Sequence, residues 1–387
     1  TVMPYIPTIQ MINIEFNQPI ILKGTKYTDD KGNEVSTIID YKDNTNTRYL
    51  SRIVREYNQF MKSNIIQIPV MDYINHNMND DTAVISYAKI NKVIDHVYRI
   101  DNIFNNGIVL SDFKDDRNDD DIDSRYIYKY IDGINNCIIY NPAITHNNLV
   151  NVEYLVNLSP FLHRVFVNGS FDSLGRFYGA DYQLYDSKSR SRILINGNPV
   201  IELDYKAMHA TMMYNYSDME YEGDPYDLYN SNELLRGAVK FMFNIAINTS
   251  SKQDAYKAFL WKFNQPKKEK MKRIKAEMIK HNLTPKVLLQ RILDVHPIFE
   301  DYLSSGMGLT FQNKDSMIAS DILEHFTNRN IPCLCVHDSF IVEREYKIEL
   351  FEEMRDTYKK HMNGFECAID AKDIFDSSEE DPDYTHA

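Results

Sequence analysis

The chain has 387 residues, of which 43% are hydrophobic, and a formal net charge of −13 at pH 7. This length predicts two or three domains or subdomains, and the negative charge argues against a protein that coats nucleic acid indiscriminately. No run of 18 apolar residues occurs, so we expect no membrane-spanning helix. We expect no secretory signal either. The four cysteines show neither CxxC nor zinc-site spacing, which fits a reducing, cytoplasmic compartment.

The charge is unevenly distributed along the chain. Residues 112–123 and the tail at 377–383 are acidic and predict solvated segments. Between residues 251 and 291, in contrast, there are twelve Lys or Arg and three Asp or Glu. The densest part, residues 267–275, follows a proline and predicts a basic helix. Such a helix is usually a solvated face, but in a nucleic-acid enzyme it would contact phosphates.

The first 150 residues mix polar loops with short apolar runs. Residues 56–61 predict a helix and residues 64–70 predict a strand. The patterns become sharper after about residue 150. Residues 199–204 predict a strand that ends at Asp204, and residues 205–212 predict a helix directly after it.

A second aspartate stands at the tip of a predicted β-hairpin. Apolar runs at 331–335 and 341–342 flank Val336-His337-Asp338-Ser339-Phe340. Asp-Ser is also ordinary turn chemistry, which would explain Asp338 without any function. Two strand-end aspartates can, however, meet side by side on one sheet. Such a pair holds two Mg²⁺ ions about 3.5–4 Å apart in nucleotidyl-transfer enzymes.

Two helices are predicted between these aspartates. Asn230 with Glu233 three residues later marks the start of a helix that ends near Asn248. A second helix fits residues 314–328, before the stop signal at 330–332. The order of elements predicts an antiparallel sheet carrying the two acids, with a helical subdomain inserted between its acidic strands. This is an α+β architecture.

The first of these helices presents a polar stripe. Arg236 and Lys240 are four residues apart and share a face, which continues through Asn244 and Asn248. A stripe of two cations and two amides suits a triphosphate, because lysine supplies a point charge and arginine a fork of donors. Two solvated basic residues on an ordinary helix would show the same spacing.

Three other residues stand where they could contact nucleic acid. Arg176 follows Gly175, which permits a tight backbone turn, and could meet a phosphate. Tyr178 could stack on a base. Gln312, expected just before the 314–328 helix, could donate to minor-groove acceptors. A plain turn into a strand and a helix-flanking polar residue are the alternatives.

Taken in order, these motifs resemble those of the single-subunit nucleic-acid polymerases, which include the phage and mitochondrial RNA polymerases and the family A DNA polymerases. Asp172-Ser173-Leu174-Gly175-Arg176 is similar to their DxxGR element, and Leu203-Asp204-Tyr205 to the motif with the first metal-binding aspartate. Residues 236–240 resemble the start of the fingers helix, and residues 337–340 the second metal-binding motif. The resemblance covers about residues 150–345.

The resemblance implies a right-hand fold with an antiparallel palm sheet, helical fingers and a reduced N-terminal region. The palm would comprise residues 151–228 and, with the tail, 311–387; the fingers would comprise residues 229–310, and residues 1–150 would form the N-terminal region.

The resemblance also implies roles for the site residues. Asp204 and Asp338 would hold two Mg²⁺ ions with the help of the Tyr205 backbone carbonyl. Lys240 and Arg236 would grip the incoming triphosphate. In addition, Arg176 would contact the template or primer backbone, and His337 would position the primer end.

Three features of the resemblance favour RNA as the product. Ser339 follows the His-Asp pair, where the DNA polymerases usually carry Glu. His209 stands five residues after Asp204, where those enzymes have a Glu that blocks the ribose 2′-hydroxyl. The DxxGR element replaces their TxxGR. One departure is that Asn248-Thr249 stands where the family has a Tyr-Gly pair, so sugar selection would use other groups.

We therefore expect the catalytic chain of a small phage-type, DNA-dependent RNA polymerase that uses nucleoside triphosphates and Mg²⁺. Its compactness resembles the two-subunit RNA polymerases of some lytic phages, which implies a single-stranded or opened DNA template. It also implies a second subunit or a single-stranded-DNA-binding protein as partner. The alternatives are a phage or mobile-element DNA polymerase or primase of the same fold, and a catalytically silent nucleic-acid-binding subunit.

Overall fold

The computed structural model describes residues 18–28, 34–76, 83–85, 126–131, 134–140, 149–264 and 269–371. The acidic segments at 112–123 and 377–383, and Lys267 and Lys268 of the basic segment, lie outside the described residues. The chain forms two compact units, each built from several segments. The first comprises Thr1–Gln18, Asn58–Phe161 and Gly179–Val200, and the second comprises Pro19–Tyr57, Leu162–Tyr178 and Ile201–Ala387.

The first unit is built around an antiparallel sheet. The strand expected at 64–70 is confirmed as part of β4 (Ile66–His76), which pairs with β8 (Leu149–Asn157) over nine consecutive residue pairs. The strands lie in the order β11, β4, β8, β7 and β6, with β5 also paired to β4. Their bounds are Leu194–Ile195 for β11, Ala83–Ile85 for β5, Tyr126–Ile131 for β6 and Ile134–Tyr140 for β7. Two short helices, η4 (Asp181–Leu184) and α4 (Ser187–Arg190), complete the unit.

The second unit contains the sheet that the sequence predicted for the two aspartates. Its strands are β13 (Leu334–Val336), β14 (Ser339–Glu343) and β12 (Asn198–Tyr205), in that order, and β15 (Ile369–Ala371) also pairs with β12. The expected strand at 199–204 and the expected hairpin are confirmed. Val336 pairs with Ser339, so His337 and Asp338 form a two-residue hairpin loop. All five residues of β14 are buried, which makes this hairpin part of the core.

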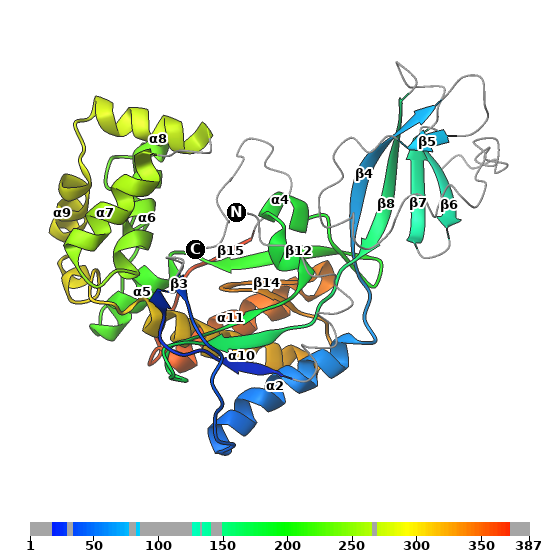
Figure 1. Ribbon diagram of the computed structural model, residues 1–387, viewed down its shortest axis with the longest axis horizontal. Coiled ribbons are helices and arrows are strands. Elements are labelled where there is room, and N and C mark those ends of the chain that lie inside the picture. Colours follow the sequence, from blue (N-terminus) through cyan, green and yellow to red (C-terminus); the bar gives the residue numbers. More distant parts are fainter. Residues whose placement is uncertain are drawn as a thin grey trace. The chain divides into compact units, whose positions relative to one another are not determined.

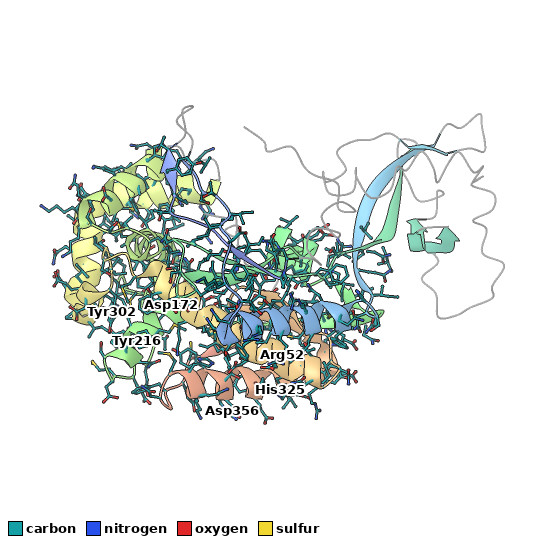
Figure 2. All side chains as sticks on the ribbon, turned by 60° about the horizontal axis from the view of Figure 1, so that its bottom comes forward. Arg52, Asp172, Tyr216, Tyr302, His325 and Asp356 are labelled. Atoms are coloured by element: carbon teal, nitrogen blue, oxygen red, sulfur yellow. The ribbon has the colours of Figure 1, made fainter. Side chains whose placement is uncertain are left out.

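A second, smaller sheet in this unit carries the DxxGR segment. Strand β1 (Ile20–Leu22) runs parallel to β9 (His163–Phe166), and β10 (Leu174–Tyr178) runs antiparallel to β9. Helix α10 (Gly308–Asn328) packs along β10 and also against α11 (Lys347–His361). Helix α2 (Thr45–Met61) includes the helix expected at 56–61 and carries Arg52 (Figure 2). Arg52 forms an ion pair with Glu324 of α10. The strands β2 (Tyr27–Thr28) and β3 (Glu34–Val35) form a separate pair.

Four helices form a group of their own, seen at the left of Figure 1. Helix α6 contacts the other three, which lie around it. Their bounds are α6 (Glu233–Ile247), α7 (Lys252–Asn264), α8 (Glu269–Lys280) and α9 (Pro285–Val295). The predicted helical subdomain between the two acidic strands is therefore present, and the fold is mixed α+β with an antiparallel sheet. Among the described residues no helix has both the length and the apolar character needed to cross a membrane.

Three predicted helix boundaries were wrong. Helix α5 begins at Met208 rather than at 205 and ends at Tyr216. The cap of α6 is Asn232, whose side chain accepts a hydrogen bond from the Leu235 backbone N–H at 3.1 Å, whereas Asn230 lies in the preceding turn at a φ of 53°. Helix α10 begins at Gly308, so Gln312 lies within the helix and not before it. A Cβ on Gly308 would stand 2.7 Å from the Ile247 carbonyl oxygen, so glycine lets α10 begin hard against the end of α6.

Candidate functional site

The two strand-end aspartates lie on neighbouring segments of one sheet. Strand β12 ends at Asp204 and Tyr205, and the Tyr205 backbone N–H donates to the Asp338 carbonyl oxygen at 3.4 Å. Burial raises the pKa of the Cys367 thiol to about 12, and the negative charges of Asp338 and Asp204 both add to this effect. Both carboxylates therefore act on the same buried thiol.

Strained backbone accompanies these residues. Twelve non-glycine residues in the described part of the chain have positive φ, and seven of them are Asn or Asp, which, like His, adopt the left-handed region more often than other residues. The remaining five include Leu174, Ala207 and His337. Leu174 lies in the DxxGR segment, Ala207 stands three residues after Asp204, and His337 directly precedes Asp338. Backbone strain of about 1–3 kcal/mol per residue persists where the surrounding structure enforces it, most often at functional sites.

A buried acid that the sequence did not reveal organises the centre of the site. Asp315 of α10 is 2% exposed. Its carboxylate accepts hydrogen bonds from Arg176 Nε at 3.1 Å and from Arg176 Nη2, and His209 Nε2 lies 2.7 Å from Oδ2. Burial acts to raise the pKa of Asp315, but the charge of Arg176 and the hydrogen bonds from His209 and Arg176 outweigh it, so the pKa is lowered. The carboxylate is thus held ionised.

This arrangement changes the interpretation of Arg176. We expected its guanidinium to be directed at the template or primer backbone, but its side chain is 16% exposed and is held in a fork by Asp315. Burial acts to lower the pKa of Arg176, yet the charges of Asp315 and Asp338 raise it above its ordinary value. Arg176 is therefore bound to the buried Asp315 carboxylate, and the negative charge of Asp338 also acts on it.

Another buried arginine, also missed from the sequence, supports this core. Arg164 of β9 is fully buried, and burial lowers its pKa to about 10. It donates to the Gly175 carbonyl oxygen at 2.7 Å and to the hydroxyls of Ser320 and Ser316 at 2.8 and 2.9 Å. These bonds join β9 and β10 to α10. A Cβ on Gly175 would lie 2.6 Å from the Phe166 ring, so the glycine of the DxxGR segment is required for this packing.

The tyrosines of the site behave differently from one another. The Tyr178 and His337 rings are 5.6 Å apart and edge to face, so Tyr178 supports the histidine of the hairpin. Tyr205 is 3% exposed, and its hydroxyl donates to the Met354 carbonyl oxygen. The Tyr205 side chain therefore belongs to the core, and the expectation that its backbone carbonyl helps to hold a metal stays a prediction. Only its backbone remains available to the site.

The hairpin that carries Asp338 is also hydrogen-bonded to a buried acid. Glu202 lies two residues before Asp204 on β12 and is 4% exposed. The Ser339 hydroxyl donates to Glu202 Oε1 at 2.9 Å. The residue that follows Asp338 thus links the hairpin to β12. A glutamate within the predicted strand at 199–204 was the available sequence signal for this contact.

The polar stripe of α6 is exposed as its spacing predicted. Lys240, Asn244 and Asn248 are exposed, and Arg236 is partly exposed and forms an ion pair with Asp224. At the C-terminal end of the stripe, Gln312 Nε2 donates to Asn248 Oδ1 at 3.2 Å. The structure therefore brings together Gln312 and the α6 stripe, which were predicted from separate segments.

Buried Tyr226 connects this stripe electrostatically to the sheet. Burial raises the pKa of Tyr226 above its ordinary value, and the charges of Asp224 and Asp338 raise it further. Arg236, which pairs with Asp224, acts in the opposite direction. The α6 cation and the hairpin aspartate thus act on the same phenol.

The predicted basic helix is present as α8 and packs directly on α6. A Cβ on Gly237 would stand 3.1 Å from Ile274 of α8, and the Asn232 side chain donates to Glu277 at 3.1 Å. Figure 1 shows α8 lying across the end of α6. Arg273 and Lys272 of α8 are exposed. The basic helix is therefore anchored beside Arg236 of the polar stripe.

Oxygen donors for a magnesium ion are present at the strand ends. Two carboxylates suffice for Mg²⁺, which binds proteins through one or two carboxylates and completes its shell with water and substrate phosphates. Among the described residues no group of three or more His, Cys, Asp or Glu side chains forms a closed metal cage. Asp204 and Asp338 are the two carboxylates at these strand ends that could take part in such a site.

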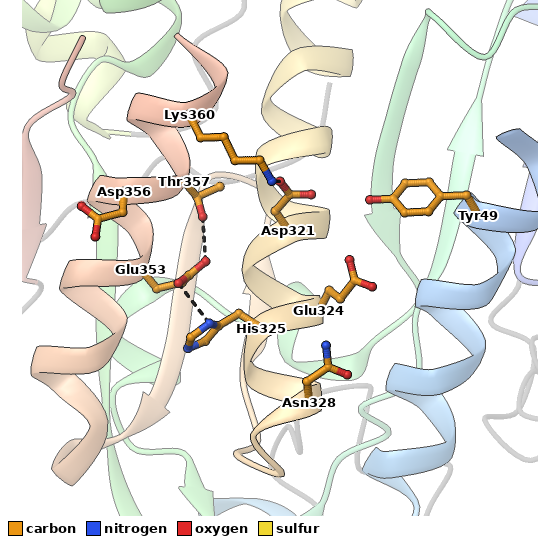
Figure 3. A pocket seen from close by; sticks show the side chains of 9 residues that line it. All are labelled: Tyr49, Asp321, Glu324, His325, Asn328, Glu353, Asp356, Thr357 and Lys360. Atoms are coloured by element: carbon orange, nitrogen blue, oxygen red, sulfur yellow. Dashed lines mark hydrogen bonds and ion pairs between the residues drawn. The ribbon is translucent and has the colours of Figure 1, made fainter. Parts of the chain in front are cut away.

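A cavity of about 410 Å³ lies elsewhere in this unit, between α2, α10 and α11 (Figure 3). It is lined by acidic side chains together with His325 and Lys360, and Asp321 pairs with Lys360 at 2.7 Å. His325 lies 3.1 Å from Glu353. None of the predicted site residues lines this cavity, so it is separate from the paired aspartates.

Comparisons with known proteins give little further information. No protein-family model matches the sequence, and no curated protein matches it. Among solved structures, the chain is similar to the POL domain of Pol1 from M. smegmatis in complex with DNA primer-template and dNTP. The likeness has 11% sequence identity and a TM-score of 0.32, and it covers 54% of this chain and 47% of that one. The match thus spans about half of each chain.

Proposed function

We propose that this chain is the catalytic chain of a template-directed nucleic-acid polymerase and that its product is RNA. The observation that supports this proposal most directly is the placement of Asp204 and Asp338 on neighbouring segments of one sheet, linked by the Tyr205–Asp338 backbone hydrogen bond. In the proposed architecture this sheet is the palm and the helices α6 to α9 are the fingers. The order of motifs that resembles the single-subunit polymerases supplies the reaction class.

In the proposed reaction the 3′-hydroxyl oxygen of the growing strand attacks the α-phosphorus of a nucleoside triphosphate, and pyrophosphate leaves. Asp204, Asp338 and the Tyr205 carbonyl are the groups that would hold Mg²⁺, which would supply charge neutralisation at the reacting phosphate. Lys240 and Arg236 would bind the triphosphate from α6. Exposed Lys240 is free to turn toward it, whereas Arg236 would exchange its partner Asp224 for phosphate.

The residues around Asp315 have a positioning role in this proposal. Asp315 fixes Arg176, whose charge interacts with that of Asp338, so Arg176 would supply a positive charge near the metal-binding carboxylates. Asp315 also fixes the orientation of the His209 ring. His337, held by Tyr178 in a left-handed turn, would set the primer end.

The proposal of an RNA product rests on His209 and Ser339. A carboxylate at position 209 would repel the adjacent Asp315, whereas a histidine forms the observed 2.7 Å contact with it. The imidazole would offer its other ring nitrogen, Nδ1, to a ribose hydroxyl. Ser339 is committed to Glu202, which is consistent with the RNA polymerase form of the motif.

Primer extension on a single-stranded DNA template tests this function. We expect Mg²⁺-dependent addition of rNTPs to an RNA primer, with dNTPs used much less efficiently. Preferential use of dNTPs would make the chain a DNA polymerase or primase of the same architecture. If no nucleotide is added at any Mg²⁺ concentration, even when a partner subunit or a single-stranded-DNA-binding protein is supplied, the chain is a silent nucleic-acid-binding subunit and the proposal fails.

A further inference from the structure

One tryptophan in the group of helices α6 to α9 has a largely solvent-exposed side chain. Trp261 of α7 is 65% exposed, more than any other aromatic side chain in the described ranges with a large exposed surface. The buried side chains of α7 are Ala255, Phe259 and Phe263, which follow one another at intervals of four. Trp261 lies two residues, or about 200° of helical rotation, from Phe259 and Phe263. It therefore occupies the face of α7 opposite the core and cannot be buried by a change of rotamer.

The surroundings of Trp261 are cationic. Lys262 is its exposed neighbour, and Lys257 lies one turn earlier on the same stripe. Lys275 of α8 lies beside the buried Phe263 and not beside Trp261, since its Nζ lies 5.2 Å from the centre of the Phe263 ring and 3.3 Å from Asn264 Oδ1. The surrounding segment, residues 251–291, has nine more basic than acidic residues in a chain with a net charge of −13.

An exposed aromatic ring among cations matches the chemistry of an unpaired nucleotide strand. Lysines attract the phosphates of the backbone, and the indole offers a face on which a base can stack. Base–aromatic stacking contributes about 1–3 kcal/mol per base and accepts any base, because each has a π-face. A protein partner docking here would need acidic complementarity as well as an apolar contact, whereas nucleic acid supplies both charge and rings in every residue.

We propose that Trp261 is a stacking platform for an unpaired base of single-stranded nucleic acid, and that Lys257 and Lys262 of α7 hold the flanking phosphates. The inference deepens the proposed function and rests on it for the identity of the strand, which would be the unpaired template. The binding itself requires no catalysis. It can therefore be measured in the absence of nucleotides and Mg²⁺, and also in the Asp338→Asn variant.

The chain provides its own probe, because Trp261 is its single tryptophan. Titration with a short single-stranded oligodeoxynucleotide should quench the tryptophan fluorescence, with the same midpoint as the anisotropy of a labelled oligonucleotide. An oligonucleotide of equal length and charge made of abasic sites should bind through its phosphates but leave the fluorescence nearly unchanged. A duplex of the same length should also quench weakly, because its bases are already stacked.

Variants then separate stacking from charge. Trp261→Ala should weaken oligonucleotide binding by about 5- to 100-fold, which is the range that corresponds to one stacked base, and Trp261→Phe should restore most of it. Ile348→Ala, which removes a side chain that is 73% exposed on α11, is the matched control and should leave binding unchanged.

Three outcomes would overturn the inference: absence of quenching at saturating oligonucleotide, equal quenching by the abasic strand, or a change from dimer to monomer in Trp261→Ala without a change in oligonucleotide binding. The last would identify a second copy of the chain as the occupant. Failure of primer extension together with base-dependent quenching would reject the polymerase proposal and leave this binding site intact.

Discussion

Replacing Asp315 by asparagine tests the buried centre of the site most sharply. The Asp315 carboxylate is 2% exposed and forms hydrogen bonds with Arg176 and His209. In Asp315→Asn, the amide N–H₂ group would face at least one of these two side chains. The charge of Arg176 would also lose its buried counter-ion. Removing one partner of a buried ion pair costs about 3–5 kcal/mol. At about 2–4 °C per kcal/mol, we expect Tm to fall by about 6–20 °C.

Thermal denaturation at pH 7 measures this effect. The matched control is Asp356→Asn, which removes an exposed carboxylate paired with Arg355 at 2.8 Å and should leave Tm nearly unchanged, because exposed ion pairs contribute little to stability. Replacing both members of the buried pair, with Arg176→Met added to Asp315→Leu, should give a protein more stable than Asp315→Leu alone. The double variant removes the unpaired buried charge.

The effect has a defined dependence on pH. The pKa of Asp315 is below its ordinary value in the folded protein, so its contribution to stability is complete above the unfolded pKa of about 3.9 and is lost as the pH falls through the lower folded pKa. The difference between wild type and Asp315→Asn should therefore be constant near neutrality and shrink in acid. An unchanged Tm at pH 7 would refute the assignment of Asp315 as the counter-ion of Arg176.

Three further results are expected. Lys240→Ala should lower both kcat for nucleotide addition and nucleotide affinity while template binding is retained. The control Lys286→Ala removes another exposed lysine and should extend primers normally. If Lys240→Ala extended primers as well as this control, the α6 stripe would be an ordinary solvated face. Changing Lys267, Lys268, Lys270 and Lys272 to Gln together should weaken template binding for all sequences. The slope of log affinity against log salt should become shallower by about 0.7 for each phosphate that the variant no longer binds. An unchanged slope would exclude template binding by this basic segment. Burial and the nearby Lys23 lower the pKa of His163 to about 4, so the unfolded chain takes up a proton on this histidine before the folded protein does. Wild type should therefore lose up to about 3 kcal/mol of stability between pH 6.5 and pH 4. The His163→Gln variant should lose less over this range, and the exposed-histidine control His281→Gln should behave as wild type.

The parts of the fold that follow local rules were predictable from the sequence. Alternating or continuous apolar runs located β12 and the β13–β14 hairpin, and the four-residue spacing of Arg236 and Lys240 correctly predicted one exposed face of α6. The N-terminal capping residue of α6 was harder to predict from the sequence, because Asn230 and Asn232 both precede Glu233. The left-handed turn at Asn230 decides between them, and that turn depends on backbone angles that the sequence does not display.

The buried centre could not be predicted in the same way, because it joins residues far apart in the chain. Asp315 lies 139 residues from Arg176 and 106 from His209. One signal was available. Phe311, Asp315, Ile318 and Ile322 recur at helical spacing, so Asp315 is an acid on the apolar face of its helix, which requires a buried partner. Arg164 has no comparable local signal, since its partners Ser316 and Ser320 are ordinary polar residues.

The central claim is that Asp204 and Asp338 form one catalytic pair, and the most direct measurement is single-turnover primer extension by Asp204→Asn and Asp338→Asn. Each variant should lose at least about 10³-fold in rate, equivalent to about 4 kcal/mol of transition-state stabilisation. Because the exchange is isosteric, we expect each to keep the fold, a cooperative thermal transition and oligonucleotide binding. The double variant should be little slower than either single one, since the two residues act as a unit. If either variant extended a primer at a rate near that of wild type, the claim that these two strand-end aspartates form the active site would be contradicted.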